Sequence, residues 1–177
     1  MKKALVLSFC AFFVLASIGC GKKKPAGMPD LQPTTLTITQ GGAPLAGATV
    51  NFRSTDSSMS SWTCGGMTDE KGVATIVTHG QYKGAPVGKY KVSVNKTEWE
   101  GEAPPSVVDE ASAKALEEYK KSGKKYEEFY LVDPKYAIVE TTPLEVEIVK
   151  GKNDLTADVG EPVHEKAQSS SGAGGVL

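Results

Sequence analysis

Hydrophobic and polar residues alternate along most of the chain between residues 34 and 160. A period of two places every second side chain on one face of a strand, so the pattern predicts β-strands with one buried face and one solvated face. Strands of this kind favour two packed antiparallel sheets. The clearest segments are residues 36–38, 48–52, 74–76, 90–94, 144–148 and 155–159, and two shorter candidates are residues 61–64 and 129–132.

Turn-forming residues separate the predicted strands. Glycine and proline are concentrated in residues 41–47 and 84–88, and residues 151–154 join the last two strands. In the segment 68–72, Asp69 stands early and Gly72 occupies the position that tolerates a positive φ angle. These connections predict tight links between neighbouring strands.

One segment has the spacing of a helix. Ser106 and Asp109 are spaced as a capping box, and Ser122-Gly123 offers an end. We therefore predict a short amphipathic helix at about residues 107–121, inserted in a long loop. It is expected to cover one edge or end of the sandwich, with a binding lid as the alternative. The apolar residues at helical spacing are Val108, Ala111, Ala115, Leu116 and Tyr119.

The two ends of the chain differ from its centre. Residues 20–33 are rich in Lys, Pro, Gly and Ala, which predicts a flexible tether. Residues 161–177 are rich in Ser and Gly and are expected to be disordered. Since His164 falls in this tail, no functional role is expected for it. Residues 34–160 remain for one folded domain.

Residues 1–19 have the layout of a secretory signal peptide, with two lysines, an apolar run and a small residue at the end. The apolar run from residue 4 to residue 18 is shorter than the roughly 20 residues that a membrane-spanning helix needs. A transmembrane anchor is therefore the less favoured interpretation. The chain is expected to be exported.

The segment Ser17-Ile18-Gly19-Cys20 resembles the lipobox of bacterial lipoproteins, in which a small residue precedes a cysteine that becomes diacylated and N-terminal. The resemblance implies lipidation at Cys20 and anchoring at the cell envelope, because two acyl chains hold a protein stably at a membrane. Gly21 implies the outer membrane, since in such lipoproteins a residue other than Asp usually goes with transfer there. Plain signal cleavage with a free Cys20 is the open alternative.

The 20 Lys and Arg residues nearly balance the 21 Asp and Glu residues, for a net charge of −1. Nucleic-acid-binding proteins usually carry a clustered basic face, so no nucleic-acid partner is expected. With three cysteines and two histidines, a disulfide framework or a Cys/His metal site is not expected either. We accordingly predict no cofactor and no metal.

Three strings, GGAPLAGATVNF, TDEKGVATI and GAPVGKYKVSV, resemble the carboxypeptidase-regulatory-like, transthyretin-like modules of secreted bacterial proteins. The resemblance covers about residues 36–159 and implies a seven-stranded antiparallel sandwich of the Ig-like or prealbumin-like type. With the lipobox and the final stretch from Leu144 to Asn153, the chain is especially similar to small lipoproteins that planctomycetes encode in many copies. Residues 98–128 contribute nothing to the match, and the resemblance implies almost nothing about function.

Candidates for catalysis are few. Cys64 and His79 are the one conceivable thiol and imidazole pair, but no third orienting group is apparent. A small packed hydrophobe is the favoured interpretation of Cys64. The loop carboxylates lack a calcium-binding spacing and are interpreted as solvated turn residues. These carboxylates are Asp56, Asp69, Glu70, Asp154 and Asp158. The chain is not expected to be an enzyme.

Trp62, Tyr82 and Trp99 lie near predicted strand ends or in loops. They are candidates for an aromatic platform that binds sugar or peptide, although such residues as often cover the core or an edge. We expect a lipid-anchored, non-catalytic binding or structural module whose partner is an envelope protein or a glycan. The alternatives are a periplasmic small-molecule carrier and an accessory subunit of an envelope enzyme.

Overall fold

A computed structural model describes residues 24–167 of the chain. The predicted signal peptide at residues 1–19, the predicted lipidation site Cys20 and residues 168–177 of the predicted tail lie outside the described residues. Within the described residues, no helix is both long enough and apolar enough to cross a membrane.

Strands make up most of the regular structure, and helical segments are short. The helical segments are a 3₁₀ turn η1 (Ser57–Met59), α1 (Glu110–Lys121) and α2 (Pro134–Ala137). In chain order, the strands are β1 (Leu31–Gln32), β2 (Thr34–Gln40), β3 (Ala43–Pro44), β4 (Thr49–Ser54), β5 (Cys64–Met67), β6 (Val73–Thr75), β7 (Val77–Thr78), β8 (Tyr82–Lys83), β9 (Ala85–Pro86), β10 (Gly88–Asn95), β11 (Thr97–Gly101), β12 (Tyr126–Tyr130), β13 (Glu145–Ile148), β14 (Asn153–Asp158) and β15 (Glu165–Lys166).

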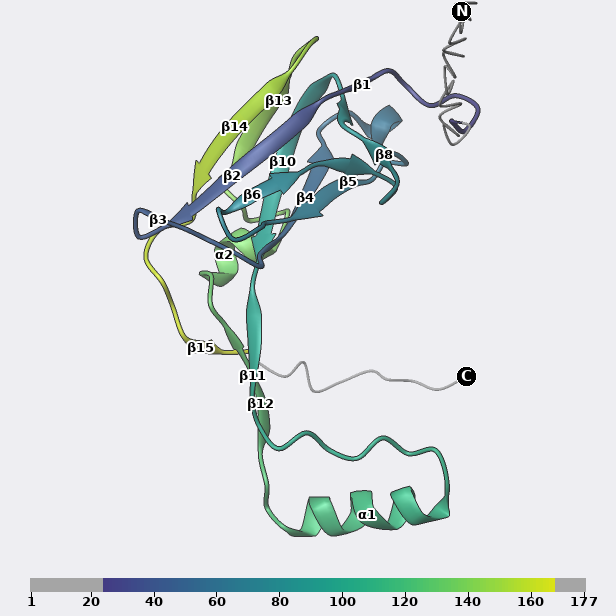
Figure 1. The fold of residues 1–177 in the computed structure, drawn as a ribbon, viewed down its shortest axis with the longest axis vertical. Coiled ribbons are helices and arrows are strands. Elements are labelled where there is room, and N and C mark those ends of the chain that lie inside the picture. The colour runs from purple at the N-terminus through teal and green to yellow at the C-terminus, as the bar shows by residue number, and fades with distance from the viewer. Residues whose placement is uncertain (1–23, 168–177) are drawn as a thin grey trace, which may run out of the picture.

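Two sheets pack face to face as a sandwich (Figure 1). One is a six-stranded sheet in the order β13-β10-β4-β5-β7-β8, and the other contains β14, β2 and β3, with β6 also paired to β2. Alternate residues of the long strands fill the space between them, as the period of two predicts. The all-β sandwich with a small helical insertion is thereby confirmed. Its fully buried side chains include Leu36, Ile38, Val50, Ile76, Tyr90, Val92, Val94 and Ile148.

Strand pairing departs from the prediction in two places. β14 runs parallel to β2, from Asn153 opposite Thr34 to Asp158 opposite Thr39, so the sandwich is not purely antiparallel. The chain can form this pair because β13 joins β10 while β14 crosses to the other sheet. The strand predicted at 74–76 ends at Thr75 as β6, which pairs with β2 in one sheet, and after Ile76 the chain continues as β7, which pairs with β5 in the other sheet.

Both ends of the described chain are more ordered than the sequence predicts. β1, inside the predicted tether, pairs with β9, and β15, inside the predicted disordered tail, pairs with β12. Neither segment has a hydrophobic pattern that would predict a strand. Each pairs instead through backbone hydrogen bonds to the free edge of a neighbouring strand. The Ala167 N–H, for example, donates to the Glu128 carbonyl at 2.7 Å.

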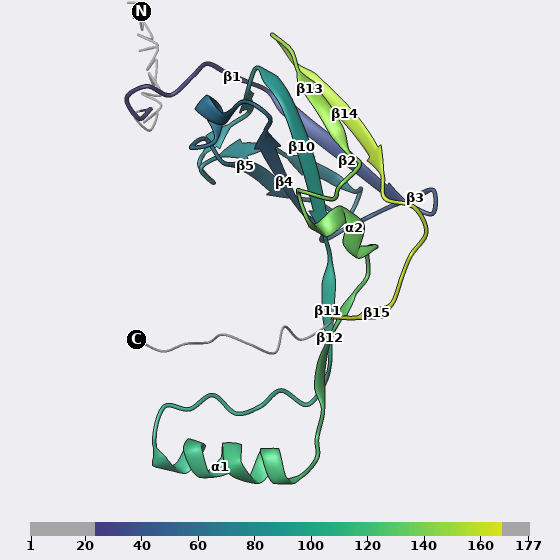
Figure 2. The same cartoon turned by 180° about the vertical axis from the view of Figure 1, so that it is seen from behind.

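The helical insertion forms an arm, which we define as residues 97–130. β10 continues past the sandwich as β11, which pairs antiparallel with β12, and α1 lies beyond this hairpin at the far end (Figures 1 and 2). The prediction that the helix covers an edge of the sandwich is therefore wrong. The predicted cap is also shifted. Asp109 is the N-cap and forms the capping box with Ser112, so the helix begins at Glu110 rather than at residue 107.

Candidate functional site

The arm is attached firmly to the sandwich at its base. The Leu131 N–H donates to the Lys96 carbonyl at 2.9 Å, directly beyond the last pair of the β11–β12 ladder. The buried amide of Gln40, on β2, donates to the Leu131 carbonyl at 2.8 Å. The base of the arm thus connects the two sheets, since Lys96 directly follows β10 of one sheet and Gln40 belongs to β2 of the other.

The far end of the hairpin requires a glycine. Gly101 has a φ angle of +99°, and a Cβ atom at this residue would lie 2.0 Å from the Lys125 carbonyl oxygen. Beyond it, the Tyr119 hydroxyl donates to the Glu102 carbonyl, and Lys124 forms an ion pair with Glu102. These contacts hold α1 and Lys124 against the segment that directly follows β11.

The register of β11 and β12 gives the arm two chemically different faces. Directly opposed residues of an antiparallel pair project to the same face, and neighbours along a strand project to opposite faces. We call one side the aromatic face and the other the acidic face. The aromatic face contains Thr97, Trp99, Tyr126, Glu128 and Tyr130, and the acidic face contains Glu98, Glu100, Glu127 and Phe129.

The aromatic face carries an exposed pair of rings. Trp99 and Tyr126 stack with their centroids 4.8 Å apart and an angle of 22° between the ring planes. Trp99 is nevertheless 53% exposed and Tyr126 37% exposed. Large aromatic residues dominate the energy of protein interfaces because they bury much apolar area at a small entropic cost. This face therefore exposes a large aromatic area to solvent.

The acidic face is joined by two residues of the segment around β15. The His164 Nε2 atom lies 3.0 Å from the Glu100 carboxylate and 3.2 Å from the Glu98 carboxylate. Its ring stacks on Phe129 with a centroid distance of 4.3 Å. Lys166 pairs with Glu127 at 2.6 Å, and its ammonium holds the pKa of that carboxyl below its ordinary value.

His164 could not be predicted as part of a site from the sequence. Residues 161–177 contain few large apolar residues and therefore resemble a disordered tail, but strand pairing at a sheet edge needs no such residues. The alternation of Glu98 and Glu100 about Trp99 was visible in the sequence. No sequence signal, however, connects these two carboxylates with a histidine more than 60 residues later.

The predicted aromatic residues do not form one platform. Trp62 stacks on His79, with ring centroids 5.0 Å apart, and Tyr82 pairs with Thr78 in the β7–β8 hairpin of the same sheet. Trp99 lies on the arm, well away from β8 (Figure 1). Trp99 instead has Tyr126 as its aromatic neighbour.

Cys64 and His79 each have their own partners. The Cys64 thiol is buried and contacts the Thr78 hydroxyl and the Trp62 carbonyl, both at 3.3 Å. Burial raises the pKa of this thiol, whereas a cysteine nucleophile needs a lowered pKa. The His79 Nε2 atom lies 2.7 Å from the Ser61 carbonyl oxygen. Cys64 is therefore a packed residue, as the sequence favours.

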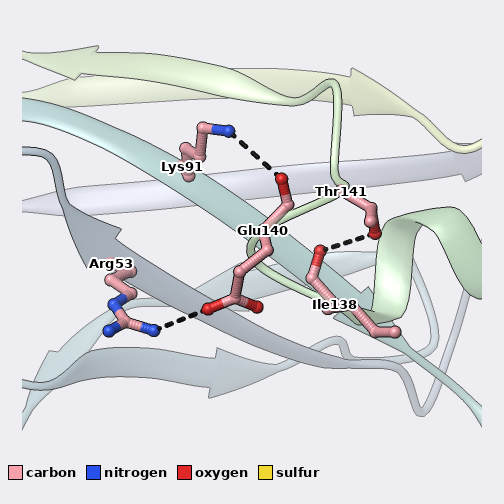
Figure 3. Close-up of polar contacts among 5 residues, drawn as sticks. All are labelled: Arg53, Lys91, Ile138, Glu140 and Thr141. Atoms are coloured by element: carbon pink, nitrogen blue, oxygen red, sulfur yellow. Dashed lines mark hydrogen bonds and ion pairs between the residues drawn. The ribbon is translucent and has the colours of Figure 1, made fainter.

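A groove crosses the outer side of the six-stranded sheet between Trp62 and residues 138–140. It has a volume of about 360 Å³ and is lined by Asn51, Arg53, Met59, Trp62, Ser93 and Val139 among others. Arg53 forms an ion pair with Glu140 at 3.1 Å, and Lys91 reaches the Glu140 carbonyl at 3.5 Å (Figure 3). Thr141 in turn donates to the Ile138 carbonyl, which shapes the loop beside the groove. The groove offers apolar and polar side chains together with the Arg53 guanidinium.

Comparisons with protein-family models, with curated proteins and with solved structures found no match to the chain. The resemblance to carboxypeptidase-regulatory-like lipoproteins accordingly stays a prediction from the motifs.

Proposed function

We propose that the chain is an exported lipoprotein, anchored at the outer membrane by lipid on Cys20, that binds an envelope protein through the aromatic face of its arm. It acts by placement and binding rather than by catalysis. The observation that carries the proposal is the Trp99–Tyr126 stack, which is half exposed on a hairpin that stands off the sandwich. An aromatic pair in this position provides a recognition surface with a polar rim formed by Glu128 and Glu165.

The arrangement of the ends supports presentation of the arm away from a membrane. The described chain enters the sandwich through β1, which lies at the end opposite the arm in both views (Figures 1 and 2). A lipid on Cys20 would precede β1 by a short Lys/Pro/Gly-rich tether. The anchor would then hold one end of the sandwich while the aromatic face projects from the other.

The rigidity of the hairpin favours binding as well. Backbone pairing fixes β11 and β12, and the ring stack restricts both aromatic side chains before a partner arrives. Less conformational entropy is then lost on association than with a loose loop. Truncation of one central aromatic residue in such a surface typically costs about 2 kcal/mol or more, which corresponds to about 30-fold in affinity.

Photocrosslinking from the two faces of the arm tests this proposal. A benzophenone amino acid replaces Glu128 on the aromatic face or Glu127 on the acidic face, in the full chain expressed in its own cells. We expect a discrete, protease-sensitive adduct from position 128, a much weaker one from position 127, and loss of the first when Trp99→Ala is added. Equal adducts from both faces, or none, would overturn binding by this face. An adduct that is removed by glycosidases would show that the partner is a glycan and not a protein.

The groove beside Trp62 favours the small-molecule alternative. The chain has two tryptophans, so a Trp99→Phe variant leaves Trp62 as the single reporter. A carrier would show a change in Trp62 emission with extracted envelope metabolites, and Arg53→Met would abolish that change. An emission that stays constant across these extracts would remove the alternative.

A further inference from the structure

We infer that the acidic face of the arm is a binding site for a first-row divalent metal ion of the zinc type, held by Glu98, Glu100 and His164. These residues bring one ligand atom each to within 4.8 Å of one another. They come from two distant parts of the chain, β11 and the residue preceding β15. The inference is independent of the proposed partner binding and departs from the expectation of no metal site.

The spacing of the ligand atoms is compatible with one metal ion bound between them. One nitrogen, His164 Nε2, faces both carboxylates at 3.0 and 3.2 Å. Bonds of about 2.0–2.1 Å place neighbouring ligands about 3.3–3.5 Å apart in a tetrahedron and about 2.9 Å apart in an octahedron. The two observed distances lie between these values. Both carboxylates are about half exposed, so a small rotation brings their oxygens around one ion.

The charge of the cluster also calls for a cation. The one imidazole is the ion-pair partner of both Glu98 and Glu100. Two carboxylates and a neutral imidazole sum to −2, and a protonated imidazole still leaves −1. Lys166, two residues after His164, pairs with Glu127 instead. A divalent ion would neutralise the two carboxylates and release the imidazole to act as a ligand.

The ligand types indicate which class of metal binds. One imidazole nitrogen with two carboxylates suits zinc and similar ions, whereas calcium and magnesium prefer an all-oxygen set. Stacking on Phe129 at 4.3 Å and 16° restrains the imidazole plane, so Nε2 is held toward β11 before a metal arrives. The exposed side of the cluster leaves room for water to complete the coordination.

Metal binding would also fasten the C-terminal segment to the arm. β15 is held to β12 by two register pairs, and the Ala167 N–H donates to the Glu128 carbonyl. A bond from His164 to a metal shared with β11 links all three strands of this small sheet. The Ala167 amide should therefore exchange its proton more slowly when the metal is bound.

Calorimetric titration of the chelator-treated full chain with zinc chloride tests the inference, with amide exchange at Ala167 as a second measurement. The variants are His164→Ala and the isosteric Glu98→Gln/Glu100→Gln. The matched control is His79→Asn, which removes the other imidazole, and Asn tolerates the positive φ of 52° at that residue.

We expect one zinc ion per chain, slower exchange at Ala167, and affinity weakened by at least about tenfold in both cluster variants but not in the control. The expected slowing of exchange is lost in the same two variants. Zinc binding that is unchanged in His164→Ala, lost in His79→Asn, or absent from the full chain would overturn the inference.

Discussion

Replacement of Gly101 by alanine should loosen the arm while leaving the sandwich intact. Gly101 closes the β11–β12 ladder opposite Tyr126 at a φ angle of +99°. A Cβ atom there would lie 2.0 Å from the Lys125 carbonyl oxygen. Backbone atoms form this contact, so the hairpin must open at its end rather than move a flexible side chain.

The expected cost has two parts. A non-glycine residue with this kind of positive φ angle costs about 1–2 kcal/mol. Displacing the Lys125 carbonyl weakens neighbouring backbone hydrogen bonds, at about 0.5–1.5 kcal/mol each. The sum is about 2–4 kcal/mol, which corresponds to about 30-fold to 800-fold faster local opening.

Gly123→Ala is the matched control, because Gly123 has a φ angle of +70° and no heavy atom within 4 Å of the added Cβ. Amide hydrogen exchange is measured in residues 126–130 and, for the sandwich, in residues 34–40. Gly101→Ala should accelerate exchange in 126–130 well beyond the control, and exchange in 34–40 should stay unchanged. Equal acceleration in both variants would contradict the close approach, and loss of protection in 34–40 would contradict an arm that opens locally.

Other parts of the fold make separate predictions. Ile38 is fully buried, so Ile38→Ala should lower the free energy of unfolding by about 2–5 kcal/mol. Thr37→Ala, on the opposite face of the same strand, should lower it by less than about 0.5 kcal/mol. Similar losses of unfolding free energy in the two variants, measured in urea, would refute this orientation of the strand. Hydrogen bonds from the Thr39 hydroxyl and the Gly160 N–H hold the pKa of Asp158 below its ordinary 3.8. The ionised Asp158 therefore stabilises the fold above that pH, and the stabilisation is lost as the pH falls through the lowered pKa. In Asp158→Asn, the free energy of unfolding measured in urea should depend less on pH between about pH 2 and 5 than in the wild type. Burial raises the pKa of the Cys64 thiol, so this thiol should not react with iodoacetamide at neutral pH until the chain unfolds. Peptide mapping measures its modification, and rapid alkylation in the folded chain would contradict its burial.

The alternation of side chains was enough to predict the sandwich. β2 and β4 alternate between buried and more exposed residues as predicted, and β10 does so apart from Ser93, which is buried as well. The turn at Asp69 was also predictable. Its carboxylate accepts from the Lys71 and Val73 N–H groups at 2.9 Å, and Gly72 has a φ angle of +75°.

There is a physical reason why the arm and its acidic face could not be predicted from the sequence. β12 is half exposed and β15 is exposed, so these short strands carry little hydrophobic pattern. They pair through backbone hydrogen bonds at a sheet edge. Likewise, no local signal shows that β14 runs parallel to β2. That direction follows from the crossing of the chain between two sheets, after which the Thr35 and Thr39 hydroxyls bond to Asp154 and Asp158.

Metabolic labelling with an alkyne palmitate tests the anchoring of the chain most directly. Wild type and Cys20→Ala are compared in the native cells, and the N-terminal peptide of the envelope-bound protein is analysed by mass spectrometry. We expect a mature chain that begins at a diacylated Cys20, and a label that disappears in the variant. A label that persists in Cys20→Ala, or a mature chain that begins at another residue, would contradict this expectation.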